Sequence, residues 1–120
     1  MVVGVGIDIV EIARIARANR RPRFTRKILT EHEEAYCGTT ERIAGRWAAK
    51  EAVIKALGVK YHPREIEILN DPIGQPHVRI DNPHFDAGRL RIYVSITHER
   101  THAAAVAVVE RIVIQRSIVT

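Results

Sequence analysis

The chain has 120 residues, of which 46% are apolar, and this length and composition predict one globular domain spanning residues 1–120. No apolar run approaches the roughly 20 residues of a membrane span, and the N-terminus lacks the features of a signal peptide. We therefore predict a cytoplasmic protein. The formal net charge of +5 predicts a negatively charged partner: nucleic acid, membrane lipid or an acidic protein.

The chain begins with a predicted strand and a predicted helix. Residues 2–7 are apolar and mostly β-branched, which indicates a buried strand, and Asp8 follows the end of this strand. A helix is predicted over residues 10–20, before Pro22. Its predicted apolar face consists of Ile12, Ile15 and Ala16. Its opposite face carries three arginines, Arg14, Arg17 and Arg21.

Two more helices are predicted before residue 60. Thr30 and Glu33 have the spacing of a capping box and predict the start of a short helix, with Gly38 as its stop. Residues 40–57 are rich in Ala, Glu, Lys and Arg, which favours a long helix that ends at Gly58.

The second half of the chain predicts strands. They are expected at residues 65–69, 77–80, 90–96 and 103–109, with turns between them. Residues 112–119 alternate only weakly. One strand, three helices and then strands is the order of an α+β fold, in which helices pack on a mostly antiparallel sheet.

Asp8 is the first candidate for chemistry. A carboxylate at the end of a strand is suited to a hard cation such as Mg²⁺. The alternative is that Asp8 caps the helix that follows.

Glu51 and Lys55 form the second candidate, since residues four apart share one face of a helix. The alternative is an ordinary surface ion pair. Trp47 lies one turn before Glu51, however, and indicates a partly covered face. Charged groups on such a face need partners, which a metal ion and a phosphate would supply.

His98, at the end of a predicted strand, is the third candidate. His102 follows it by four residues, but this segment predicts strand and turn, and a zinc site would need further ligands. The alternative is a loop histidine without function.

These segments together resemble the bacterial holo-acyl-carrier-protein synthases, a short class of 4′-phosphopantetheinyl transferases. The matching segments occur in the family's order: residues 6–12, Phe24 with residues 28–30 and Glu33, residues 46–52 and 55–58, residues 66–68, Gly74, Pro76 and residues 95–98. Two positions are notable: Val10 stands where longer members carry a second acid, and Trp47 replaces a common Phe. Residues 111–120 match no landmark of the family.

The resemblance implies a fold, a reaction and roles for residues. The enzyme would transfer 4′-phosphopantetheine from coenzyme A to a serine of apo-acyl carrier protein, in fatty acid biosynthesis. The holo-carrier and adenosine 3′,5′-bisphosphate would be the products. Asp8 and Glu51 would bind Mg²⁺, Lys55 would hold the pyrophosphate, and Arg46, Ser95 and His98 would bind coenzyme A. For the general base, Glu51 and a metal-bound water remain alternatives.

The resemblance also implies partners. Carrier proteins of this kind are acidic, and Arg14, Arg17 and Arg21 offer the complementary charge to dock one. The alternative is that these arginines form a solvated helix face. The chain would form a homotrimer with active sites between subunits, so that His98 and the Asp8–Glu51 pair come from different chains. Neither nucleic acid nor a membrane would be a partner. The competing hypothesis is a small basic nucleic-acid-binding module without catalysis, but aromatics for base stacking make up only 5% of the chain.

Overall fold

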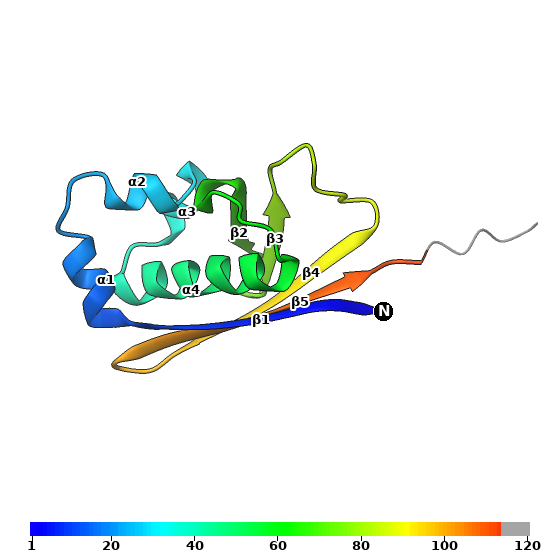
Figure 1. Cartoon of the computed structure of the whole chain (residues 1–120). Helices are drawn as coiled ribbons and strands as arrows, with labels where there is room; N and C mark the ends of the chain where they lie inside the picture. The colour runs from blue at the N-terminus through cyan, green and yellow to red at the C-terminus, as the bar shows by residue number, and fades with distance from the viewer. Residues whose placement is uncertain (114–120) are drawn as a thin grey trace, which may run out of the picture.

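A computed structural model describes residues 1–113 and confirms the predicted α+β class (Figure 1). The elements in chain order are β1 (Val2–Glu11), α1 (Ile12–Ala18), α2 (Phe24–Ile28), α3 (Glu31–Tyr36), α4 (Thr40–Leu57), the short 3₁₀ helix η1 (Pro63–Glu65), β2 (Ile66–Asn70), β3 (Pro76–Ile80), β4 (Leu90–His98) and β5 (His102–Arg111). Within residues 1–113, no helix is both long and apolar enough to cross a bilayer.

The strands form two antiparallel sheets. The larger sheet has the order β1-β5-β4, and β2 and β3 form a separate hairpin. In the larger sheet, Asp8 of β1 pairs with Ala105 of β5, and Ala105 pairs with Ile96 of β4. Helix α4 lies along one face of the larger sheet, and α1, α2 and α3 gather towards one end of the molecule (Figure 1). The core lies around α4: it fills the space between α4 and this sheet, and it continues into residues of α2 and β2 such as Ile28 and Ile68.

Two glycines allow α4 to approach β1 very closely. A Cβ atom at Gly4 would lie 1.9 Å from the carbonyl oxygen of Ala56, and one at Gly6 would lie 2.0 Å from that of Ala52. Because backbone cannot yield as a flexible side chain can, no other residue fits at either position without moving the helix. This contact brings Asp8, which follows on the same face of β1, next to α4.

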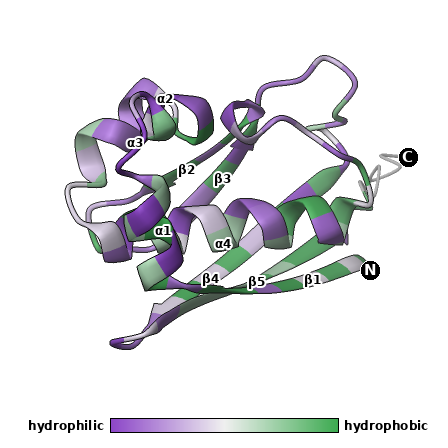
Figure 2. Ribbon diagram, turned by 60° about the vertical axis from the view of Figure 1, so that its left-hand side comes forward, coloured by the Kyte–Doolittle hydropathy of each residue, from purple (hydrophilic) through white to green (hydrophobic). Residues whose placement is uncertain are grey.

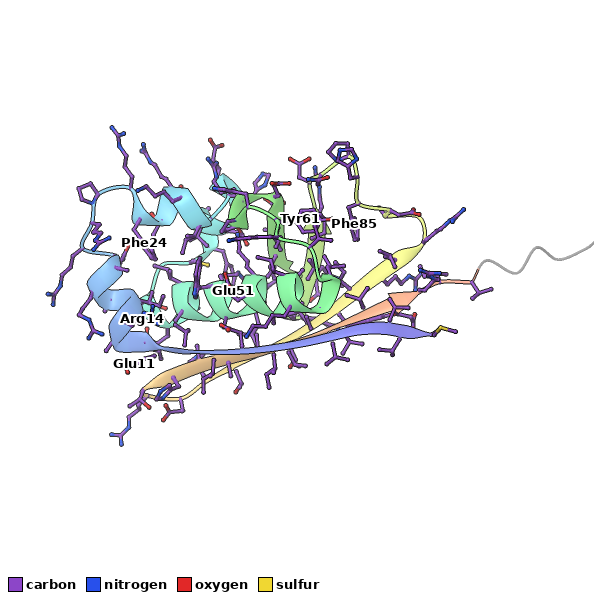
Figure 3. All side chains as sticks on the ribbon, viewed as in Figure 1. Glu11, Arg14, Phe24, Glu51, Tyr61 and Phe85 are labelled. Atoms are coloured by element: carbon purple, nitrogen blue, oxygen red, sulfur yellow. The ribbon has the colours of Figure 1, made fainter. Side chains whose placement is uncertain are left out.

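The other face of the larger sheet is apolar and uncovered. The β1 side chains of Val5, Ile7 and Ile9 are between 62% and 67% exposed, and Tyr93 on β4 is exposed as well. Apolar strand segments dominate this sheet in Figure 2, and side chains project from its face away from α4 in Figure 3. An apolar surface of this kind is typical of a protein–protein interface.

The predicted boundary between the first strand and helix was wrong. Strand β1 continues past Asp8 because its ladder with β5 runs on until Glu11 pairs with His102. Asp8 therefore lies inside a strand, and the alternative that it caps a helix is also wrong, since Glu11 occupies the N-cap of α1. Ile12 and Ile15 are buried as predicted, but Ala16 is exposed.

Predictions from local caps were more successful. Both hydrogen bonds of the capping box between Thr30 and Glu33 are present, and Gly58 ends α4 with a φ of 69°. Helix α3 ends at Tyr36, before Gly38. Helix α2 was not predicted. The strands β2 to β5 lie within two residues of the predicted ranges, and the weakly alternating tail falls largely outside the described residues.

Candidate active site

Asp8 and Lys55 form an ion pair where β1 meets α4. The Nζ of Lys55 lies 3.2 Å from Oδ1 of Asp8 and donates a second hydrogen bond to the carbonyl of Ile7 at 3.0 Å. The Asp8 side chain is 17% exposed and the Lys55 side chain 54%. Lys55 thus pairs with Asp8, so the alternative of a Glu51–Lys55 surface pair is wrong.

Glu51 lies one turn before Lys55 and is partly buried. It lines a cavity of about 490 Å³, whose wall is formed by Trp47, Glu51, Ile54, Gly58, Val59, Lys60, Tyr61 and Pro63. The predicted covered face around Trp47 is therefore confirmed. Within residues 1–113, the Glu51 carboxylate has neither a hydrogen-bond nor an ion-pair partner, so it is available to a ligand.

The donor set of Asp8 and Glu51 fits a magnesium ion. Lys55 contacts Asp8 and lies one helical turn after Glu51 on α4, so both carboxylates are close to Lys55 in the fold or on the helix. No group of three or more His, Cys, Asp or Glu side chains suited to a metal occurs in residues 1–113. Two carboxylates fit the usual Mg²⁺ site, in which substrate phosphates and water supply the other oxygens.

Arg46 and His98 meet at a second cleft, of about 170 Å³. Its lining consists of Tyr36, Glu41, Arg42, Gly45, Arg46, Asn70, Ile96 and His98. The Arg46 side chain is buried, donates a hydrogen bond to Asn70 and stacks over the Tyr36 ring, at 5.0 Å from its centroid. Its Nε has no partner among the described residues. A buried guanidinium with an unused donor, beside an exposed histidine, suits a phosphate.

The predicted site residues do not all lie at one site in the folded chain. The cleft of Arg46 and His98 is lined by neither Asp8, Glu51 nor Lys55. Ser95 is exposed on the outer face of β4, whereas its neighbours Val94 and Ile96 pack towards α4. Within one chain, Arg46 and His98 thus line a different cavity from Glu51, Lys55 contacts Asp8, and Ser95 lies on the other side of the sheet.

Arg14, one of the predicted docking arginines, lies at the end of the molecule occupied by α1 (Figure 3). Arg14 and Arg17 belong to α1, and Arg17 lies 3.8 Å from the Glu11 carboxylate. Arg21 lies beyond the helix, which ends at Ala18, so the prediction of one helical face for all three was wrong. The chain leaves helical geometry before Pro22 is reached.

The main polar feature missed from the sequence is a buried ion pair between Glu33 and Lys50. The side chains are 0% exposed, and Nζ of Lys50 lies 2.6 Å from Oε1 of Glu33. Burial lowers the pKa of Lys50 from its usual range, and the charge of Glu33 opposes this shift. One signal was present in the sequence: Lys50 interrupts the alanine-rich stretch around it, on a helix otherwise predicted to pack.

Two carboxylates beside a lysine, in a molecule with a separate arginine–histidine cleft, form the kind of site found in enzymes of phosphate transfer. The family model of the 4′-phosphopantetheinyl transferase superfamily matches residues 4–108, and the chain belongs to this family.

Individual relatives agree with this assignment. The chain is 38% identical to the holo-[acyl-carrier-protein] synthase of Clostridium tetani, over 92% of this chain and 97% of the relative. It is 40% identical to that of Halalkalibacterium halodurans, over 93% and 98%. Among solved structures, the synthase of Bacillus anthracis in complex with CoA (3′,5′-ADP) is 36% identical, with a TM-score of 0.81, over 92% of this chain and 98% of that one. The Helicobacter pylori synthase in complex with coenzyme A is 32% identical, with a TM-score of 0.81, over 88% and 99%.

Proposed function

We propose that this protein transfers the 4′-phosphopantetheine group from coenzyme A to a serine of apo-acyl carrier protein, with adenosine 3′,5′-bisphosphate as the second product. Membership of the family and the relatives' activity support the reaction. The observation that carries the proposal is the pair of carboxylates beside Lys55: Glu51 is partly buried without a partner, and Asp8 is held against α4.

In the proposed mechanism, the serine oxygen of the carrier attacks the β-phosphorus of coenzyme A, and the bond from that phosphorus to the bridging oxygen breaks. Arg46 and His98 bind and orient the nucleotide phosphates. Lys55 offers a compact positive charge to the pyrophosphate. Asp8 and Glu51 would hold Mg²⁺, which would supply positive charge to the phosphate oxygens. The serine proton leaves to a base, for which Glu51 is one candidate.

We also propose a homotrimer with active sites shared between subunits. The uncovered apolar face of Val5, Ile7, Ile9 and Tyr93 supports association, because such a surface is costly to leave in water. The separation of the Arg46–His98 cleft from the Asp8–Glu51 pair supports shared sites. In such an assembly, one subunit supplies the metal ligands and its neighbour supplies His98 and Ser95, which faces outward.

The carrier protein is proposed to dock at Arg14, Arg17 and Arg21. The formal charge of +5 supports an acidic partner, and charge complementarity mainly increases the rate of encounter. We propose that the reaction serves fatty acid biosynthesis in the cytoplasm. The competing hypothesis of a nucleic-acid-binding module has no support from the family match, and it leaves Asp8, Glu51 and Lys55 without a role.

Intact-mass spectrometry tests the reaction directly. A bacterial apo-acyl carrier protein is incubated with this protein, coenzyme A and Mg²⁺, with EDTA added to a parallel sample. We expect the carrier to gain the mass of one phosphopantetheine and EDTA to abolish this gain.

A parallel incubation with a carrier whose acceptor serine is replaced by alanine controls for adducts elsewhere. Absence of the mass gain across several carriers would contradict the proposed reaction. A gain that persists in EDTA would contradict only the metal requirement.

A further inference from the structure

The ion pair between Glu33 and Lys50 lies entirely inside the protein, and every donor of its ammonium group is used. Nζ of Lys50 donates to Oε1 of Glu33 at 2.6 Å, to the carbonyl of Ile28 at 2.6 Å and to the carbonyl of Pro63 at 2.9 Å. An ammonium has three donors, so Lys50 is fully satisfied without water. Lys50 thereby ties α4 to the end of α2 and to η1.

The carboxylate of Glu33 connects two further segments. Its Oε1 accepts a hydrogen bond from the backbone N–H of Thr30 at 2.9 Å, and its Oε2 accepts one from that of Ile68 at 2.9 Å. The same residue therefore closes the cap of α3 and holds the centre of β2. Through this pair, α4 has a fixed relation to four other segments.

Stability alone is a poor explanation for such a pair. Removing two charges from water is expensive, and apolar side chains of similar volume are often as stable or more so. A buried pair of this kind does, however, admit few geometries, because each hydrogen bond must keep its length and direction.

The face of α4 that packs on the sheet carries only small side chains. This face consists of Gly45, Ala48, Ala49, Ala52, Val53 and Ala56. Small side chains let the helix come close to β1, but they form shallow ridges that resist rotation about the helix axis poorly. Lys50 projects from the flank of α4 and is anchored at three points, so it can fix that rotation.

Glu51 directly follows Lys50, and its side chain leaves the helix about 100° further round the axis. The rotation that Lys50 fixes therefore sets the direction of the Glu51 carboxylate relative to Asp8 on β1. The distance between two metal ligands must be held within fractions of an ångström for tight binding.

We propose that Glu33 and Lys50 are positioning residues for the metal site, which set the rotation of α4 and with it the geometry of Asp8 and Glu51. This inference rests on the part of the proposed function in which these two carboxylates bind a divalent cation. Neither Glu33 nor Lys50 contacts the metal or the substrate in this scheme.

The test measures Mn²⁺ binding by electron paramagnetic resonance, first without and then with coenzyme A, in the wild-type protein and in the double variant Glu33→Gln/Lys50→Met. This variant keeps the volume of both side chains and removes both charges together, so no charge is left buried alone. We expect it to fold and to bind Mn²⁺ about tenfold more weakly, as is typical when groups that orient metal ligands are lost.

Val53→Ala is the matched control. Val53 is 0% exposed on the same helix, and it has no part in the polar network. Its truncation lowers the melting temperature, but Mn²⁺ affinity should stay within about twofold of wild type if stability alone is affected. Should the double variant not fold, Glu33→Asp serves instead. It keeps both charges and shortens the reach, and a smaller loss of affinity is expected.

The outcomes separate this inference from the proposed function. A folded double variant, or a folded Glu33→Asp variant, with wild-type Mn²⁺ affinity would overturn the positioning role while transfer by the wild type stands. Equal losses in Val53→Ala and the double variant would overturn it too. Wild-type protein that binds no Mn²⁺ either without or with coenzyme A would overturn the metal site itself, and the positioning role with it.

Discussion

Lys55 makes contacts within the fold and is also accessible to a ligand. Its ammonium group contacts the Asp8 carboxylate and the Ile7 carbonyl, yet its side chain is 54% exposed on a flexible stem. The same charge can therefore turn to a phosphate that enters beside Asp8. Glu51 contrasts with it, since its carboxylate is partly buried and unpaired within residues 1–113. This contrast leaves the charge of Glu51 available to a ligand.

Glu51→Gln should preserve the helix and remove most of the transfer activity. The amide keeps the size of the side chain but removes the charge that attracts a cation, and we expect a loss of about 100-fold or more at fixed Mg²⁺. Initial rates of carrier modification check this, with circular dichroism to confirm folding. Full activity in the variant would exclude Glu51 as a metal ligand.

His98→Ala should show which phosphate of coenzyme A His98 contacts. If His98 contacts the 3′-phosphate, its removal should raise KM for coenzyme A by about tenfold, the value of one charge-assisted hydrogen bond. KM for dephospho-coenzyme A, which lacks that phosphate, should change little. Equal increases for both substrates would assign His98 to the pyrophosphate.

At the scale of elements, the contact of α4 with β1 leaves no room for a side chain at Gly4 or Gly6. Gly6→Ala places a methyl group 2.0 Å from a backbone oxygen, so the helix must move away from the strand. We expect a loss of about 1–3 kcal/mol of stability, together with weaker metal binding, because Asp8 and α4 separate. Thermal unfolding and Mn²⁺ titration measure the two effects.

Gly38→Ala is the control, since no atom lies within 4 Å of the added Cβ. It should leave the melting temperature and the metal affinity close to wild type. Equal behaviour of the two variants would contradict the close-packing argument.

The turn between β4 and β5 should respond to acid. The Thr101 hydroxyl, together with the backbone N–H groups of Thr101 and His102, hydrogen-bonds to Glu99 and lowers the pKa of its carboxyl to about 2. A lowered pKa in the folded state stabilises the protein above the unfolded value of 4.5, and this contribution is lost as the pH falls towards 2. Unfolding curves between these pH values should show the loss.

Glu99→Gln provides the comparison, because the amide cannot titrate. The difference in stability between wild type and this variant should shrink as the pH falls. A difference that does not change with pH would remove Glu99 as its source.

Elements that depend on local sequence were predictable, and those that depend on distant partners were not. Thr30 and Gly58 determine helix ends through hydrogen bonds and a backbone conformation within a few residues. The extent of β1 depends on β5, about 100 residues away, so the sequence placed Asp8 at a strand end that does not exist. The Glu33–Lys50 pair was missed for the same reason. Glu33 was found through its local cap, whereas its partner lies on another helix.

The sequence singled out candidate residues for the site, and the structure shows how some of them are arranged. Asp8 and Lys55 form an ion pair, which the sequence did not predict, and Arg46 and His98 line one cleft. Spacing alone could not show that these two groups are apart in a single chain. Nor could it show on which face of β4 Ser95 lies, because that depends on where the strand begins and pairs.

At the scale of the whole molecule, the proposed trimer predicts complementation between inactive variants. Glu51→Gln and His98→Ala damage different halves of a site that two chains share. If they are unfolded and refolded together at equal amounts, random assembly pairs an intact Glu51 with a neighbouring intact His98 in about a quarter of the sites. Transfer rates should then reach about a quarter of the wild-type rate, well above either variant alone.

Light scattering of the wild type should give three times the monomer mass. Recovery of no activity in the refolded mixture, although both variants reassemble, would show that each chain forms its site alone.

Ile7→Asp, which puts a charge on the uncovered face, should reduce the mass towards that of a monomer.

The position of Trp47 gives the protein an optical reporter of its own. It is the only tryptophan in the chain, and it lines the same cavity as Glu51. Excitation at wavelengths that tryptophan alone absorbs therefore reports on Trp47, which lies one helical turn from Glu51, the proposed metal ligand. Binding of an ion or a substrate in that cavity can therefore be followed in real time, in unlabelled protein, from the fluorescence intensity and emission wavelength of Trp47.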